Sequence, residues 1–183
     1  TPLLQFVPWR SYALQMIAEG YLPLWNPLVG MGAPLIANYQ SAIFYPPNVL
    51  LALTGPAWGQ GLLVMLHLQW AAVGMLLFLR RLVVRRIGQI IAGLAFSLSG
   101  YMVARAGFLS INAAAAWLPW VVLACDRLVE DGSHEFTWRQ RITPALQMAV
   151  CLAMQWLAGH AQTSWYTLVF ILVWAVLRSL AAG

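Results

Sequence analysis

The chain has 183 residues, of which 62% are hydrophobic and only 8% are charged. Soluble domains carry about 25% charged residues, so this composition excludes a soluble protein and indicates an integral membrane protein with one compact bundle at most. The net charge is +5 and every basic residue is arginine. In a membrane protein such a surplus orients the helices and meets anionic lipid headgroups, and we expect no nucleic-acid partner.

The first predicted element is a short helix over 8–18 that lies along the membrane interface. Pro8 is tolerated in a first helical turn, and Gly20 suits the end of the helix. We expect this helix to direct Arg10 and Glu19 toward a cavity or water rather than lipid. The chain starts at Thr1 rather than Met and stops directly after an apolar run, so we expect it to be part of a longer protein.

Residues 20–79 carry no charged side chain, but the first part of this stretch is unlike a membrane span. Prolines at positions 23, 27, 34, 46, 47 and 56 forbid one continuous helix. A non-helical segment cannot lie bare in lipid, because unpaired backbone groups cost several kcal/mol there. We therefore expect 1–58 to be a structured extracytoplasmic loop, rich in Pro, Gly and aromatic residues, with short interfacial helices.

The rest of the chain, 59–183, is predicted to be an all-α transmembrane bundle. One helix through 87–125 would be about 58 Å long, whereas the hydrocarbon core is about 30 Å thick, so the chain must turn near 105–107. The same argument places a break at the polar residues 159–164. An alternative for both places is a kink in a longer, tilted helix. Five spans follow, near 59–79, 87–104, 108–125, 142–158 and 165–180.

The arginines orient these spans. Eight of the ten lie in 80–86, in 126–141 or at Arg178, and only Arg10 and Arg105 lie in the alternate loops. By the positive-inside rule, 80–86 and 126–141 are cytoplasmic. The acidic residues of 126–141 are interpreted as a solvated turn with charge pairs along a helix, rather than as a metal or acid–base site.

Two histidines are candidates for function. His67 lies mid-span, where it is either functional or a neutral side chain bonded to a neighbouring helix. His160 stands with Gln162, Thr163 and Ser164 in a donor-rich cluster, which suits a phosphate or a sugar hydroxyl, or is a polar turn that meets water. The sequence shows no cluster of metal ligands, so the cofactor, with a divalent metal as one option, stays undetermined.

Five motifs occur in order along the chain: LPLWNP at 22–27, GAP at 32–34, ANYQ at 37–40, FYPPN at 44–48 and GHAQT at 159–163. Together they resemble the YfhO-type family of bacterial multi-pass membrane proteins. That family is similar to the GT-C superfamily of glycosyltransferases. The resemblance implies a protein of the bacterial inner membrane that transfers a sugar from a polyprenyl-phosphate carrier to an extracytoplasmic acceptor, which is a lipid, a cell-envelope polymer or a protein.

The resemblance also implies roles for individual residues. The catalytic base is expected to be acidic and to lie upstream of Thr1, and Glu19 is a weak candidate within this chain. We expect the substrate to be bound around one outer cavity by a guanidinium for phosphate, aromatic faces for the sugar ring and polar groups for hydroxyls. These residues are Arg10, Trp25, Asn26, Gln40, Tyr45, His160 and Gln162.

Two other functions stay open at this point. One is a carrier or flippase for a lipid or small solute, with the proline-rich loop as its gate. A transporter would favour charged groups deep in several spans, and no acidic residue lies there. The other is a noncatalytic membrane scaffold.

Overall fold

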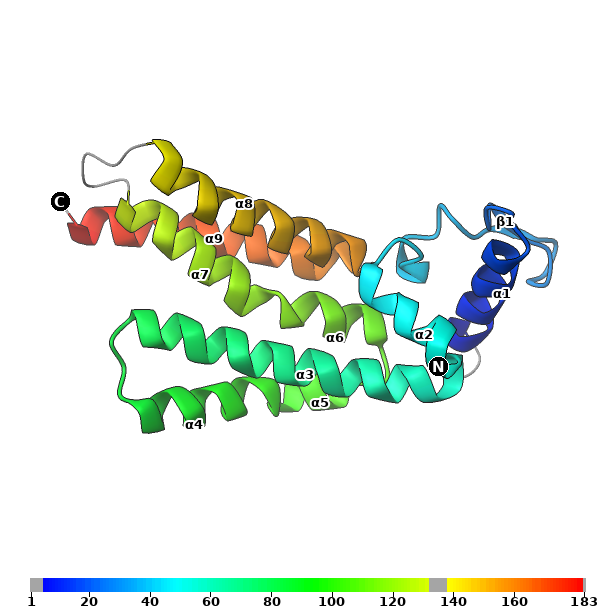
Figure 1. Cartoon of the computed structure of the whole chain (residues 1–183), viewed down its shortest axis with the longest axis horizontal. Helices are drawn as coiled ribbons and strands as arrows, with labels where there is room; N and C mark the ends of the chain where they lie inside the picture. Colours follow the sequence, from blue (N-terminus) through cyan, green and yellow to red (C-terminus); the bar gives the residue numbers. More distant parts are fainter. Residues whose placement is uncertain (1–4, 132–137, 183) are drawn as a thin grey trace.

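The computed structural model describes residues 5–131 and 138–182. Apart from one pair of two-residue strands, its elements are helical, as predicted (Figure 1). Within the described residues, four helical stretches are long and apolar enough to cross a membrane, which is the organisation of a multi-pass membrane protein. They are Pro56–Arg81, Arg86–Ala104, Leu109–Val129 and Ala161–Ala181.

The long helices run alongside one another, and the chain turns back between them (Figure 1). Their bounds are α3 Pro56–Arg81, α4 Arg86–Ser97, α5 Gly100–Ala104, α6 Leu109–Ala116, α7 Leu118–Asp131, α8 Trp138–Leu157 and α9 Ala161–Ala182. The turn predicted at 105–107 lies between α5 and α6, and the break predicted at 159–164 is shorter than expected, because α9 already begins at Ala161. Both places separate helices that run in opposite directions, so neither is a kink in one longer helix (Figure 1). Helices α6 and α7 are the buried centre, between α3 and α4 on one side and α8 and α9 on the other.

Helix α8 covers the fourth predicted span, 142–158, but is not among the four apolar stretches. It is 20 residues long, so its length is sufficient. Its polarity sets it apart, because two arginines and three glutamines interrupt the apolar residues: Arg139, Gln140, Arg141, Gln147 and Gln155. It also begins four residues before the predicted start, so Pro144 lies inside the helix.

The proline-rich loop is built from short elements gathered at one end of the bundle (Figure 1). The predicted interfacial helix is α1, Val7–Ala18, and it ends at Gly20, whose φ of +83° suits glycine. Strands β1, Trp25–Asn26, and β2, Ala33–Pro34, then pair antiparallel. Short 3₁₀ helices at Tyr39–Ser41 and Pro46–Asn48 and helix α2, Val49–Thr54, lead into α3.

Asp126 contradicts the prediction that 126–141 begins as a solvated turn, because its side chain is fully buried. Its Oδ2 accepts a hydrogen bond from Arg81 Nε at 2.7 Å, and its Oδ1 accepts from Arg178 Nε at 2.8 Å and from Trp174 Nε1 at 3.3 Å. The carboxylate therefore ties α7 to α3 and α9. Residues 132–137 of this predicted turn lie outside the described residues.

Candidate functional site

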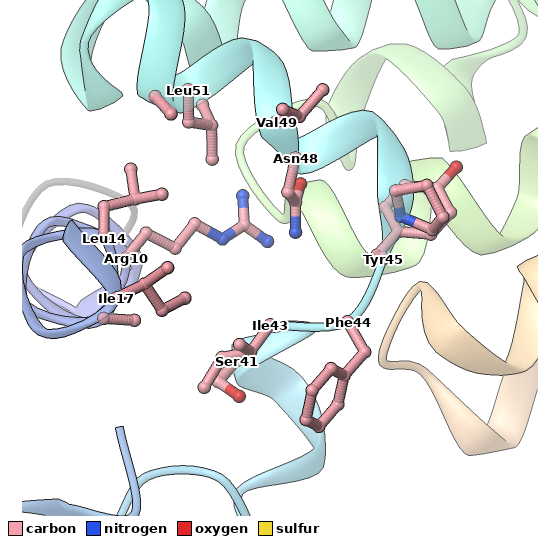
Figure 2. Close-up of a pocket in the computed structure, with 13 residues that line it drawn as sticks. Arg10, Leu14, Ile17, Ser41, Ile43, Phe44, Tyr45, Asn48, Val49 and Leu51 are labelled. Carbon is pink, nitrogen blue, oxygen red and sulfur yellow. The ribbon is translucent and has the colours of Figure 1, made fainter. Parts of the chain in front are cut away.

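A cavity of about 310 Å³ lies where α1 meets the proline-rich loop and the start of α2. Figure 2 shows the guanidinium of Arg10 extending from α1 into this cavity toward Asn48. Most other groups of the lining are apolar. The lining consists of Arg10, Ala13, Leu14, Ile17, Ser41, Ile43, Phe44, Tyr45, Pro46, Asn48, Val49, Leu51 and Ala52.

Arg10 is the charged group of the cavity, and it is only 4% exposed. Its Nε and Nη1 atoms are buried and have no hydrogen-bond partner among the described residues. Its guanidinium lies 6.0 Å from the ring centroid of Phe6, a weak contact for a cation. Burial lowers the pKa of Arg10 to about 10, so the group remains charged at neutral pH. A buried cation without a hydrogen-bonded counter-charge is costly, and an anion in the cavity would remove that cost.

Asn48 provides a further polar atom of the cavity that has no partner. Its Nδ2 donates to the carbonyl of Ala42 at 2.7 Å, which fixes the orientation of the amide. Its Oδ1 is buried and has no partner among the described residues. The cavity thus offers an unpaired donor with positive charge and an unpaired neutral acceptor. A phosphate bonded to Arg10 and a hydroxyl bonded to Asn48 would satisfy both.

Tyr45 forms part of the cavity wall, but its hydroxyl points away from Arg10 (Figure 2). The hydroxyl lies 2.7 Å from His67 Nε2 and accepts from Trp117 Nε1 at 2.9 Å. His67 Nδ1 lies 2.6 Å from the carbonyl of Leu63, which can only accept, so Nδ1 carries the proton. Nε2 of the neutral ring therefore accepts from Tyr45. Burial raises the pKa of Tyr45, which keeps this hydroxyl protonated.

This chain of bonds gives His67 the neutral, bonded form that was one of its two interpretations. All of the polar atoms in it have partners, and Tyr45 is only 2% exposed. His67 is the neutral, bonded histidine rather than an unpaired group in a span. Tyr45 was predicted to stack on a sugar, whereas its ring is instead stacked on His67, with centroids 5.6 Å apart. Its main contribution is to anchor the loop to α3 and to the residue between α6 and α7.

His160 and Gln162 are engaged locally and do not line the cavity with Arg10. His160 Nδ1 accepts from the backbone N–H of Thr163 at 3.2 Å and lies 2.7 Å from Thr163 Oγ1. The side chain of His160 thereby caps the start of α9. Burial, with a smaller effect of the nearby Arg105 charge, lowers the pKa of His160 and so favours the neutral form that can accept. Gln162 Nε2 donates to the hydroxyl of Tyr166 at 2.6 Å on the surface.

The other predicted site residues lie outside the Arg10 cavity as well. Trp25 is 52% exposed and covers Gly32, while Asn26 Oδ1 accepts from the backbone N–H of Leu28 at 2.9 Å. Gln40 is exposed. Glu19, the candidate base, is exposed and accepts from Gln15 at 3.0 Å. Among the seven predicted binding residues, the structure brings Arg10 and Tyr45 to one cavity.

The two distant sequence motifs nevertheless meet. A Cβ added to Gly159 would lie 2.6 Å from the carbonyl oxygen of Tyr39 and 3.1 Å from the Cβ of Ala42. The hydroxyl of Tyr39 donates to the carbonyl of Trp156 at 2.5 Å. The ANYQ motif therefore packs on the turn between α8 and α9. His160 stands beside this contact, whereas Arg10 occupies a separate cavity.

This contact predicts a large effect of adding one methyl group. Gly159 has a φ of +88°, which alanine adopts only with strain, and the new Cβ would press on backbone atoms. We expect Gly159→Ala to lower the free energy of unfolding by about 2 kcal/mol. Gly61→Ala is the matched control, since nothing lies within 4 Å of its added Cβ. Equal free energies of unfolding for Gly159→Ala and Gly61→Ala in detergent micelles would contradict the close approach of Gly159 to Tyr39.

Sequence reasoning missed Asn48 as a site residue, although it ends the FYPPN motif. The feature of the sequence that could have identified Asn48 is its position at the end of a proline-rich segment that leads into the bundle. Within residues 5–131 and 138–182, no group of three or more His, Cys, Asp or Glu side chains is arranged to hold a metal ion. In comparisons with known proteins, no family model, no curated protein and no solved structure matches the chain.

Proposed function

We propose that the protein is a membrane glycosyltransferase that takes a sugar from a polyprenyl-phosphate carrier and passes it to an extracytoplasmic acceptor. The observation that carries this proposal is the buried guanidinium of Arg10 inside a small cavity, with Nε and Nη1 atoms that have no hydrogen-bond partner among the described residues. Arginine binds phosphate through charge-assisted hydrogen bonds, and the Nε and Nη1 donors of Arg10 have no other partner among the described residues. The resemblance of the loop motifs to YfhO-type proteins supports the same chemistry.

The surroundings of Arg10 suit the rest of such a substrate. Asn48 Oδ1 accepts a hydroxyl of the sugar next to the phosphate. Phe44 and Val49 line the cavity and are each about 60% exposed, so they form an apolar edge along which a polyprenyl chain leaves the phosphate. A cavity of about 310 Å³ is at the lower end of the roughly 300–1,000 Å³ that small-molecule sites occupy, which suits a headgroup rather than a whole lipid.

The membrane orientation proposed for this function follows the arginines. We place the end of the bundle that carries α1 and the Arg10 cavity outside the cell, and the α3–α4 turn in the cytoplasm. Helix α8 then crosses as a fifth span, shielded by α7 and α9, beside which it lies. The general base is expected from an acidic residue upstream of Thr1, since Glu19 does not line the cavity.

Substitution of Arg10 by methionine separates binding from folding. Removing an unpaired buried charge does not weaken the fold, so we expect the unfolding temperature of the ligand-free protein to be unchanged or higher. Affinity for a polyprenyl phosphate is expected to fall about 10- to 100-fold, because charge-assisted hydrogen bonds contribute about 1.5–3 kcal/mol. The affinity is measured by titration in detergent micelles, with the matching polyprenol, which lacks the phosphate, as the control ligand.

The transfer step is tested with the full-length protein in proteoliposomes that contain a radiolabelled polyprenyl-phosphate hexose and a bacterial envelope-lipid extract as acceptor. We expect label to move to the acceptor, and Arg10→Met to slow this movement at subsaturating donor. Arg10→Lys retains the charge but not the planar guanidinium group. Its rate of transfer is therefore expected to lie between those of the wild type and Arg10→Met. Binding without transfer by the full-length protein would contradict the enzyme and favour a carrier. Equal affinities for polyprenyl phosphate and polyprenol would contradict a phosphate-binding site at Arg10.

A further inference from the structure

The turn from α3 into α4 lies at the end of the bundle opposite α1 (Figure 1). A second cavity, with polar groups in its lining, lies at this turn. It measures about 290 Å³ and is lined by Leu76, Arg80, Arg86, Gln89 and Ile90. The turn that shapes it is tight, since Val83 has a φ of +59° and Gln89 Nε2 donates to the carbonyl of Val84 at 2.6 Å. This turn brings an arginine from the end of α3 and one from the start of α4 to the same cavity.

The cavity has positive charge without a counter-charge. Arg80 and Arg86 are both exposed, and neither forms an ion pair with a carboxylate among the described residues. The nearby buried carboxylate, Asp126, is already bonded to Arg81 and Arg178. The side chains of two arginines therefore line a space that an anion can occupy.

We propose that this cavity binds the headgroup phosphate of an anionic phospholipid, a function separate from glycosyl transfer at the Arg10 cavity. The cavity lies at an end of the membrane-crossing helices, the level at which lipid headgroups lie, and basic pockets between helices there suit acidic lipids. Its apolar wall, Leu76 and Ile90, continues into the exposed apolar residues Ile91 and Leu94 of α4. An amphiphile uses both the charge and this apolar face, whereas free phosphate uses the charge alone.

The test compares three single arginine-to-glutamine variants, each of which loses one positive charge. Arg80→Gln and Arg86→Gln alter the cavity, while Arg85→Gln is the matched control because Arg85 is exposed on the same turn but does not line it. Retention of dioleoyl-phosphatidylglycerol by the purified protein is measured by native mass spectrometry and titration. We expect each cavity variant to lower affinity about fivefold and the control to change it less than twofold.

Three results would overturn the proposal. The first is an equal loss in all three variants, which indicates diffuse attraction to charge. The second is equal binding of dioleoyl-phosphatidylcholine by the wild-type protein. The third is displacement of the lipid by a large excess of inorganic phosphate, which indicates a site for the free anion. If a glutamine variant unfolds, Arg80→Lys and Arg86→Lys retain the charge, and their expected losses are smaller than those of the glutamine variants.

Discussion

Asp126→Asn is expected to lower the free energy of unfolding by about 3 kcal/mol. The substitution keeps the size of the side chain but removes the charge that Arg81 and Arg178 share. Breaking a buried pair by removing one partner costs about 3–5 kcal/mol. The lower end applies here because the arginine side chains are 24% and 36% exposed and can reach water. Equilibrium unfolding in mixed micelles, followed by tryptophan fluorescence, measures the change.

Two further variants show whether charge pairing is the cause. Glu19→Gln is the control, since Glu19 is exposed and its loss is expected to change stability by less than about 0.5 kcal/mol. Replacing the whole cluster, Asp126→Leu with Arg81→Met and Arg178→Met, is expected to recover most of the loss, because apolar packing often substitutes for a buried ion cluster. A stability of Asp126→Asn equal to that of the wild type would show that the carboxylate does not hold α3, α7 and α9 together.

Tyr45→Phe is expected to lower the free energy of unfolding by about 2–4 kcal/mol. Loss of the hydroxyl leaves His67 Nε2 without its donor and Trp117 Nε1 without its acceptor. Each buried polar group left unpaired costs about 1–3 kcal/mol. Tyr21→Phe is the matched control and is expected to have almost no effect, because Tyr21 is 65% exposed.

The same variant separates anchoring of the loop from ligand binding. Phenylalanine retains the ring that lines the Arg10 cavity, so affinity for a polyprenyl phosphate is expected to change less than threefold while stability falls. The double variant Tyr45→Phe, Trp117→Phe is expected to cost less than the sum of the single variants, since they share one hydrogen bond. Strict additivity would contradict the bonded chain from Trp117 to His67.

The candidate site was predictable in part. The helical spacing of α1 and the lack of charge in 20–58 identified the loop and directed attention to Arg10. The pairing of the site residues could not be foreseen, because whether Asn26, Tyr45 or His160 is free or bonded depends on which polar groups lie within hydrogen-bonding distance of it. Asn26 and His160 are satisfied by residues two or three positions away, and Tyr45 by residues 22 and 72 positions away.

Composition and the pattern of residues alone indicated an all-α membrane protein and the places where most of its helices turn. They also showed that loops rich in arginine alternate with loops that have few arginines. These properties follow from local requirements, since a helix must satisfy its own backbone and cannot exceed the membrane thickness without turning. Only the tertiary structure decided that Asp126 is buried between two arginines, that Tyr45 bonds the loop to the bundle, and that Arg10 Nε and Nη1 have no hydrogen-bond partner among the described residues. Each of these depends on contacts between segments far apart in the chain, and local pattern carries no information about which polar group such a contact satisfies.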